Sequence, residues 1–405
     1  MTTPRSNPFP FPAGRSAMSR RQLLIRAGAL GAAGVSLPAL LAACGGNSDS
    51  ASSGSTPATT GGTSGGGGGT SGGLFFENWP SYIDPTEGGA IGTVDRFMEA
   101  TGIDMRYTEA YNDNNEYFAK IQPLLGRGEP IDPDIIAPTS WLASRLITLE
   151  WLEKLPLDQV PNATNLRADL KNPSWDPTGE YSLPWQTGFA GIAYNSDVTG
   201  REITSVDDLF DPEFAGKVGA LTEMRDTVGV IAMSLGIDIS TISSFAEAQP
   251  AFDKLQEAKD SGQIRRFHGN DYFDDLSNGN LAITIGWSGD GRDNPAVKFV
   301  FPESGATSWA DTMVVPKGAR NVDAAAQWMN FVYDPVQAAQ ITAWVGYVSP
   351  VEGVRAEVEK LDADLANDPL VFPDDATLAN TKGFASLTDE VEAEYAAAFS
   401  AITGA

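Results

Sequence analysis

The residue types that most enzymes use for catalysis or metal binding are scarce in this sequence. His268 is the only histidine and Cys44 the only cysteine among 405 residues. Zinc sites and catalytic triads draw on clusters of such residues, so both are largely excluded, and no cofactor or metal is expected. The segment Gly286-Trp287-Ser288-Gly289-Asp290 approaches the Gly-x-Ser-x-Gly elbow of hydrolases, but an aspartate replaces the last glycine. We therefore predict no catalytic residue and no enzyme activity, and interpret His268 as structural.

Cys44 is placed for lipid attachment instead. Ser19-Arg20-Arg21-Gln22-Leu23-Leu24 matches a twin-arginine export signal, and a short run of small apolar residues follows up to Ala43. The run is too short for a membrane span and is typical of a signal peptide. Leu41-Ala42-Ala43-Cys44 resembles a bacterial lipobox, in which the cysteine is lipidated and becomes the first residue. We expect a twin-arginine lipoprotein signal peptide over 1–43 and a mature protein anchored by Cys44 on the outer side of the cell membrane.

Residues 44–73 are predicted to form the lipidated cysteine and a disordered tether. From Gly45 to Gly73 the chain consists almost entirely of Gly, Ser, Thr, Ala and Asn, with Asp49 as its only charged residue. Such a composition buries too little apolar surface to offset the entropy of ordering. A coil of 29 residues has a mean span of roughly 30 Å, which suits a globular protein held near a membrane.

The part that follows, from about Leu74, is strongly acidic. Removal of the five signal-peptide arginines leaves 22 basic residues against 53 acidic ones, a formal charge of −31. Nucleic acid is an unsuitable partner because phosphate binding needs clustered Lys and Arg. The negative field would attract a cationic ligand, but an acidic surface that serves solubility explains the charge equally well.

Predicted strands and helices alternate along this part, as in an α/β fold that begins with a parallel sheet. Near 330 residues are enough for two domains. Gly102 is expected to end a first helix, and Asp113 with Glu116 has the spacing of a capping box. The predicted strands are 74–76, 103–107, 134–137, 191–194, 281–285, 297–301 and 312–315, and later helices are 227–235, 245–258, 322–333 and 336–344.

Six short motifs occur in an order and spacing that resemble one family. They are Phe76-Glu77-Asn78-Trp79-Pro80-Ser81-Tyr82, Asp134-Ile135-Ile136-Ala137-Pro138-Thr139, Tyr181-Ser182-Leu183-Pro184-Trp185, Phe267-His268 with Asp274-Asp275-Leu276-Ser277-Asn278-Gly279, Ile285-Gly286-Trp287-Ser288-Gly289-Asp290 and Trp309-Ala310-Asp311. Each motif is weak alone. Together they resemble the polyamine (spermidine/putrescine) substrate-binding proteins of ABC transporters, from Leu74 to about Phe372.

This resemblance implies a two-lobe, periplasmic-binding-protein-like (type II) α/β fold with a hinge and a ligand cleft. Crossing segments are implied near 185–193 and 309–316, so lobe 1 would comprise 74–187 plus 312–345, and lobe 2 would comprise 188–311 plus 346–405. The implied role is to capture spermidine or putrescine outside the cytoplasm and deliver it to ABC transporter permease subunits. A monomer is expected.

The resemblance also implies a set of ligand contacts whose residue types suit a polyamine. Carboxylates form charge-assisted hydrogen bonds that offset ammonium desolvation. Aromatic faces cover methylenes and attract cations by about 0.5–2 kcal/mol each. The matching residues are Trp79, Tyr82, Thr139, Trp141, Glu223, Asp226, Trp287, Asp290, Trp309 and Asp311, with Tyr347 as a further residue of the cleft.

Alternatives exist for the residues and for the function. The three tryptophans Trp79, Trp287 and Trp309 also fit core positions, and Glu223 or Asp226 also fits a helix cap. Ser81 stands where putrescine-preferring members carry Asp, which weakens a putrescine-only interpretation, and the match is poor after residue 384. The same fold binding another amino compound or an iron complex is one alternative, and a lipoprotein hydrolase is another.

Overall fold

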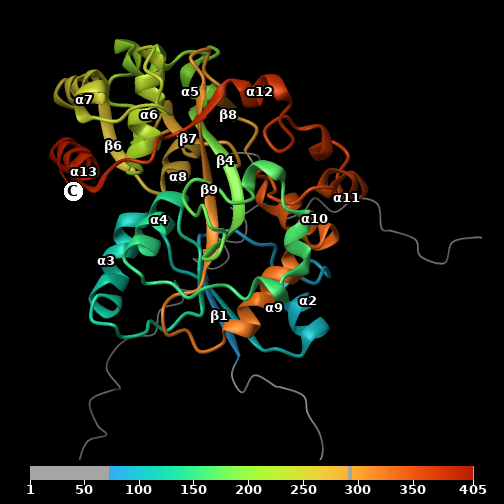
Figure 1. Ribbon diagram of the computed structural model, residues 1–405. Helices are drawn as coiled ribbons and strands as arrows, with labels where there is room; N and C mark the ends of the chain where they lie inside the picture. Colours follow the sequence, from blue (N-terminus) through green and yellow to red (C-terminus); the bar gives the residue numbers. More distant parts are fainter. Residues whose placement is uncertain (1–72, 291–293, 405) are drawn as a thin grey trace, which may run out of the picture. The chain divides into compact units, whose positions relative to one another are not determined.

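The computed structural model of the chain describes residues 73–290 and 294–404 (Figure 1). The predicted signal peptide, Cys44 and all of the predicted tether except Gly73 lie outside the described residues, so these predictions stay predictions. No helix within the described ranges is long and apolar enough to cross a membrane.

Ten strands of the described chain form one sheet in the order β2-β1-β3-β9-β4-β7-β5-β6, with β10 beside β9 and β8 beside β4. Parallel pairs join β1 to β2 and β3, and β5 to β6 and β7, whereas β4 and β9 are antiparallel to each other. The strands are β1 Leu74–Asn78, β2 Met105–Glu109, β3 Ile135–Ile136, β4 Ser182–Asn195, β5 Val218–Leu221, β6 Ile264–His268, β7 Ile283–Trp287, β8 Val297–Val300, β9 Ala306–Val314 and β10 Thr381–Gly383. The expected parallel start is confirmed, and an antiparallel pair joins two parallel blocks.

The antiparallel pair β4 and β9 belongs to both blocks. The two strands pair from Ser182 with Val314 to Ala190 with Thr307, and the far end of β4 pairs with β7 and β8. Figure 1 shows them side by side along the middle of the fold. Every residue of β4 is buried, as expected for a strand covered on both faces. β4 and β9 overlap the ranges 185–193 and 309–316, where the resemblance implies crossing segments.

Helices cover the sheet, and their ends follow local sequence signals. α2 ends at Gly102, whose φ of 72° is left-handed, as predicted. Asp113 caps α3 by accepting from the backbone N–H groups of Asn115 and Glu116, but the Glu116 side chain accepts from Asn112 instead of completing a capping box. The helices are α2 Thr93–Thr101, α3 Asn114–Leu125, α4 Ser140–Thr148, α5 Ser196–Thr199, α6 Met224–Ser234, α7 Phe245–Asp260, α8 Tyr272–Ser277, α9 Val322–Val332, α10 Pro335–Val345, α11 Val354–Leu361, α12 Asp375–Ala379 and α13 Asp389–Thr403.

Buried side chains gather around each parallel block and define two lobes. The first lobe surrounds β1–β3, with Phe76 and Trp328 in one cluster and Tyr117 and Leu142 in another. The second lobe surrounds β5–β7. Each lobe therefore has a core of its own, and the pair β4 and β9 connects them.

The end of the chain differs from the expected division. Residues 346–405 were predicted to join lobe 2, but Tyr347, Val358 and Val371 pack in the first-lobe core. The physical reason is α11, whose buried Val354 and Val358 pack against α10 of that lobe. Only the last part, with Tyr395 on α13, packs in the second-lobe core.

Candidate ligand-binding site

Asp311 lies near the middle of β9 and is held by two hydroxyl groups. The Tyr82 hydroxyl donates to its Oδ2 over 2.6 Å, and the Thr139 hydroxyl donates to its Oδ1 over 2.6 Å. Tyr82 follows β1 and Thr139 follows β3, so the order β1-β3-β9 in the sheet brings all three residues together. Asp311 is only 5% exposed, and burial raises its pKa to about 7.

Asp226, in the first turn of α6, also accepts one hydrogen bond on each carboxylate oxygen. The Trp287 indole N–H donates to its Oδ2 over 2.8 Å, and the Thr307 hydroxyl donates to its Oδ1 over 2.7 Å. Burial raises the pKa of Asp226 as well, while these two hydrogen bonds act in the opposite direction. The interaction joins α6, β7 and β9.

Asp290, just after β7, accepts from two tyrosines. The Tyr272 hydroxyl donates to Oδ2 over 2.7 Å and the Tyr347 hydroxyl to Oδ1 over 3.3 Å. Gly289 lies so close to the Tyr347 ring that a Cβ there would be 2.5 Å from it. The glycine beside Asp290 is therefore needed for the tyrosine to reach the carboxylate.

Glu223 has two roles, because its oxygens face different groups. Its Oε1 accepts from the Arg225 backbone N–H, which makes Glu223 the N-cap of α6. Its Oε2 receives the Trp141 indole N–H over 3.3 Å and the Asn114 amide over 3.4 Å, both from the first lobe. Burial raises the pKa of Glu223 to about 8. The helix-cap alternative is thus correct for Glu223, which also takes donors across the lobes.

Three aromatic rings near these carboxylates, those of Tyr82, Trp309 and Tyr347, contact one another. Tyr347 meets Trp309 edge to face at 5.0 Å and Tyr82 at 5.7 Å. Trp309 lies over Gly188, where a Cβ would be 2.5 Å from the indole. Trp79 is set apart: its indole donates to the Ala137 carbonyl and its ring packs on a core tyrosine at 4.6 Å.

The negative charge of Glu223 and Asp226 is only partly offset, because the nearby charge of Arg225 opposes the rise in the pKa of both carboxyls. Among residues 73–290 and 294–404, none of Asp226, Asp311 and Glu223 forms an ion pair with Lys or Arg; Arg225 pairs with Glu392 instead. The charge of Asp226 also raises the pKa of Asp311. Buried acids of this kind are stabilised by a cation that enters and pairs with them. No cluster of three or more metal-ligating side chains occurs in the described ranges.

Hydrogen bonds and ring contacts connect ten of the eleven predicted ligand residues, all except Trp79, into one set, directly or through Asn114 and Tyr272. Sequence reasoning missed three residues that hold the carboxylates, namely Asn114, Tyr272 and Thr307. A signal for Thr307 existed, because alternate residues of a strand share a face and Thr307, Trp309 and Asp311 alternate on β9. The direct role of each residue toward a ligand stays a prediction.

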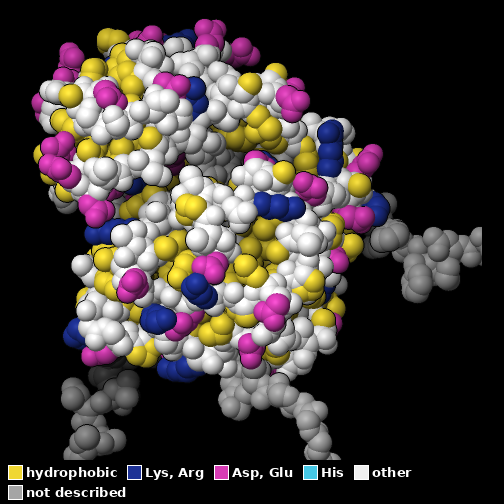
Figure 2. Space-filling view, in the orientation of Figure 1, with side chains coloured by type: hydrophobic (Ala, Val, Ile, Leu, Met, Phe, Trp, Pro, Cys, Tyr) yellow, Lys and Arg dark blue, Asp and Glu magenta, His cyan; other side chains and the backbone are white. Residues whose placement is uncertain are grey.

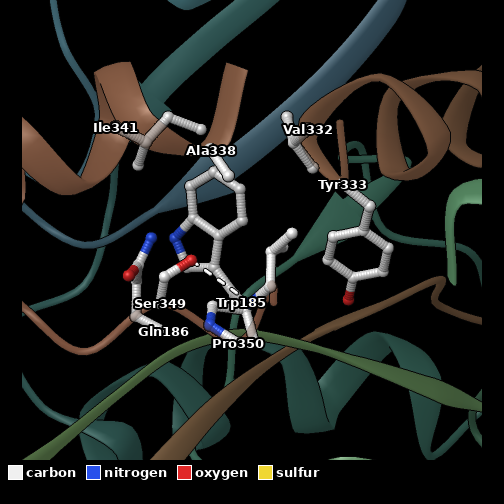
Figure 3. A pocket seen from close by; sticks show the side chains of 9 residues that line it. Trp185, Gln186, Val332, Tyr333, Ala338, Ile341, Ser349 and Pro350 are labelled. Carbon is white, nitrogen blue, oxygen red and sulfur yellow. Dashed lines mark hydrogen bonds between the residues drawn. The ribbon is translucent and has the colours of Figure 1, made fainter. Parts of the chain in front are cut away.

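A small pocket elsewhere in the fold contains no carboxylate (Figure 3). It is lined mostly by apolar side chains of α9, α10 and the segment 349–351 together with Trp185 of β4, and Gln186 and Ser349 are its polar members. It lies within the first lobe and is not the site described above. His268 is also separate: it is buried at the end of β6, and burial lowers its pKa, in keeping with a structural role.

A fold of two α/β lobes joined by two long strands, with buried acids and aromatic rings where the lobes meet, defines a solute-binding protein. This chain belongs to the bacterial extracellular solute-binding protein family, whose profile matches residues 92–373.

Relatives and solved structures agree with this assignment. The chain is 25% identical over 312 residues to the spermidine/putrescine-binding periplasmic protein of Escherichia coli K12, covering 76% of this chain and 85% of that one. It is 27% identical over 339 residues to the putrescine-binding periplasmic protein SpuD of Pseudomonas aeruginosa, covering 78% and 87%. The crystal structure of the spermidine/putrescine substrate-binding protein PotD of Streptococcus pneumoniae has the same fold, with a TM-score of 0.67, 24% identity, and 82% and 99% of the two chains covered.

Proposed function

We propose that this protein is an extracytoplasmic lipoprotein that captures a polyamine, spermidine or putrescine, and delivers it to the permease subunits of an ABC transporter. The observation that carries the proposal is a set of three carboxylates, the buried Asp226 and Asp311 and the partly buried Glu223, none of which forms an ion pair with Lys or Arg in the described part of the chain. A ligand with several ammonium groups supplies the missing positive charges.

The arrangement favours a chain-like cation over a compact one. Asp311 lies on β9 itself, whereas Asp226 is bound to Thr307, four residues away on the same face. The carboxylates are therefore spread along the strand, and Trp309 lies between those two positions. Separated acids with an aromatic surface between them match separated ammonium groups on an aliphatic chain. The names of the relatives from E. coli and P. aeruginosa support the same ligand class.

Membrane attachment is the second part of the proposal. Twin-arginine export followed by lipidation of Cys44 would leave the binding domain tethered outside the cytoplasm through residues 44–73, as a monomer. The motif Leu41-Ala42-Ala43-Cys44 supports the anchor. The protein would bind its ligand without chemical change, in keeping with its membership of a solute-binding family.

Isothermal titration calorimetry on the mature domain tests the ligand. Spermidine, putrescine, butylamine and ferric citrate form a panel that separates polyamines from a monoamine and from an iron complex. We expect spermidine or putrescine to bind at least about tenfold more tightly than butylamine, because a monoamine leaves a buried acid without its partner, and the loss of one such partner costs more than one decade in affinity. Absence of binding by every di- and polyamine would refute the function, and chemical conversion of the recovered ligand would refute the non-enzymatic role.

A further inference from the structure

Thr307 is a fully buried hydroxyl residue at the start of β9. It is 2% exposed, and its hydroxyl donates over 2.7 Å to Oδ1 of Asp226. The other oxygen of Asp226 is held by the Trp287 indole at 2.8 Å. One donor on each oxygen fixes the plane of the carboxylate, while each oxygen keeps a second lone pair for another donor.

The close approach of α6 to β9 depends on a glycine. A Cβ on Gly229 would lie 2.7 Å from the Thr307 methyl carbon, a distance that real Cβ atoms essentially never show. Gly229 stands three residues after Asp226 and therefore on the same face of α6. Because a threonine on a strand has few side-chain rotamers, an added methyl group on the helix would displace the threonine instead of being absorbed by it.

We infer that Thr307 is a positioning residue for Asp226, and that Gly229 provides the space that lets it act. This inference rests on the proposed function, since Asp226 is assigned there to an ammonium group of the ligand. Thr307 itself need not touch the ligand. It fixes the orientation of the carboxylate and favours its ionised form, because a hydrogen bond to the charged form lowers the pKa.

The test compares Thr307→Val, which keeps the shape and removes the hydroxyl, with Thr307→Ser, which keeps the hydroxyl and removes the methyl. Spermidine and putrescine affinities are measured by calorimetry between pH 5.5 and 8.5. We expect Thr307→Val to weaken affinity about tenfold at neutral pH, the effect of losing one hydrogen bond to a charged group, and to weaken it further at pH 5.5. Thr307→Ser should stay within about threefold of the wild type, below the loss of one such bond.

A double-mutant cycle with Asp226→Asn separates positioning from a general structural effect. If Thr307 acts through the carboxylate, Thr307→Val should have little further effect in the Asp226→Asn protein. An equal loss of affinity in both backgrounds, or an unchanged pH profile in Thr307→Val, would overturn the inference.

The role of Gly229 has its own control. Gly229→Ala should weaken affinity about as much as Thr307→Val does. The double variant Gly229→Ala/Thr307→Ser should regain affinity, because serine lacks the methyl group that the new Cβ would meet. Failure of this rescue would overturn the part assigned to Gly229.

A titration of the Asp226 carboxyl by carbon-13 NMR, without ligand, provides the second readout. Its pKa should be higher in Thr307→Val than in Thr307→Ser or the wild type. An unchanged pKa overturns the inference whether or not polyamines bind. If the wild type binds no polyamine, the proposed function fails, while this titration still decides whether Thr307 controls Asp226.

Discussion

Asp311 is buried, and its carboxylate accepts hydrogen bonds from two hydroxyl groups. Among the described residues, no lysine or arginine forms an ion pair with it. Its ordinary pKa is 3.8 and burial raises the folded value to about 7. Between these values the folded protein binds a proton that the unfolded chain releases, so the contribution of Asp311 to stability falls as pH rises from about 4 to about 7. The ligand-free site therefore costs the fold stability at neutral pH.

Replacement of this acid by an amide should remove that cost. Asp311→Asn cannot ionise, so the ligand-free variant should be more stable than the wild type at pH 8, by an amount on the order of 4 kcal/mol at most. The difference should shrink toward pH 5. Thermal unfolding at both pH values measures it. A purely structural role for Asp311 predicts the reverse, with a variant that is less stable at pH 8.

The same substitution should reduce ligand affinity sharply. Loss of one partner of a buried ion pair typically costs about 3–5 kcal/mol, or roughly two to three decades or more in affinity.

Wild-type affinity should also rise between pH 5.5 and 8.5, because ammonium groups pair with the ionised forms of Asp311 and Glu223, whose pKa values are about 7 and 8. Asp311→Asn should lose the part of this rise centred near pH 7. A loss of affinity under about threefold, far below the cost of a buried pair, would rule out the ligand assignment.

Much of the site could be predicted from single residues, because its acids and aromatics stand in short, ordered motifs. The residues that orient them could not. Tyr272 and Asn114 reach the carboxylates of Asp290 and Glu223 across 18 and 109 positions of sequence, and only the folded sheet brings them there. Trp79 differs from the other predicted residues because its indole donates to a backbone carbonyl, and its contact with a ligand stays a prediction.

At the scale of elements, the strands β4 and β9 connect the two lobes, and β9 also carries the site residues Trp309 and Asp311. Gly188 on β4 pairs directly with Trp309 on β9, and the absent side chain leaves room for the indole to lie across the strand. The sequence predicted β9 only over 312–315, but the strand begins at Ala306. The earlier part of β9 mixes polar and apolar residues and is a strand because it pairs with β4, which local patterns do not reveal.

Gly188→Ala should therefore weaken ligand binding by displacing Trp309. The new Cβ would lie 2.5 Å from the indole, and such overpacking costs about 1–3 kcal/mol. Calorimetry should show a loss of affinity of at least about fivefold. Gly383→Ala is the matched control, because Gly383 also lies on a strand beside β9 but its Cβ would meet nothing closer than 3.7 Å. Equal effects of the two substitutions would contradict the role given to Gly188.

At the scale of the whole molecule, acidic side chains are spread over the visible face of the protein and not gathered at one place (Figure 2). The predicted anchor would hold this acidic domain near a membrane through one lipidated residue. Cys44→Ser should release the protein from the membrane fraction in a salt wash and leave spermidine affinity unchanged, because the site lies wholly within the described domain. Retention of the variant in the membrane fraction would contradict the lipobox interpretation.

The two lobes touch across the site in this structure, away from the connecting strands. The Thr222 hydroxyl of the second lobe donates over 2.9 Å to Asp113, the cap of α3 in the first lobe. Gly269, just after β6, lies against the Asn112 carbonyl so closely that a Cβ would be 2.7 Å from it. These contacts join residues of the two lobes, so they form only when the lobes are together.

Closure should consequently depend on the ligand. Without a cation, closing buries Asp311 and Glu223 at a cost, so the free protein should favour a more open form, and spermidine should shift it toward the closed one. Small-angle X-ray scattering should show a smaller radius of gyration at saturating spermidine.

Thr222→Val removes one contact between the lobes without altering a predicted ligand residue. It should lower affinity by about two- to tenfold, the free energy of one hydrogen bond. Thr204→Val, at an exposed position of the second lobe, is its control. An unchanged radius of gyration in wild type, together with unaltered affinity in Thr222→Val, would mean that the lobes stay together without ligand and that binding does not use their closure.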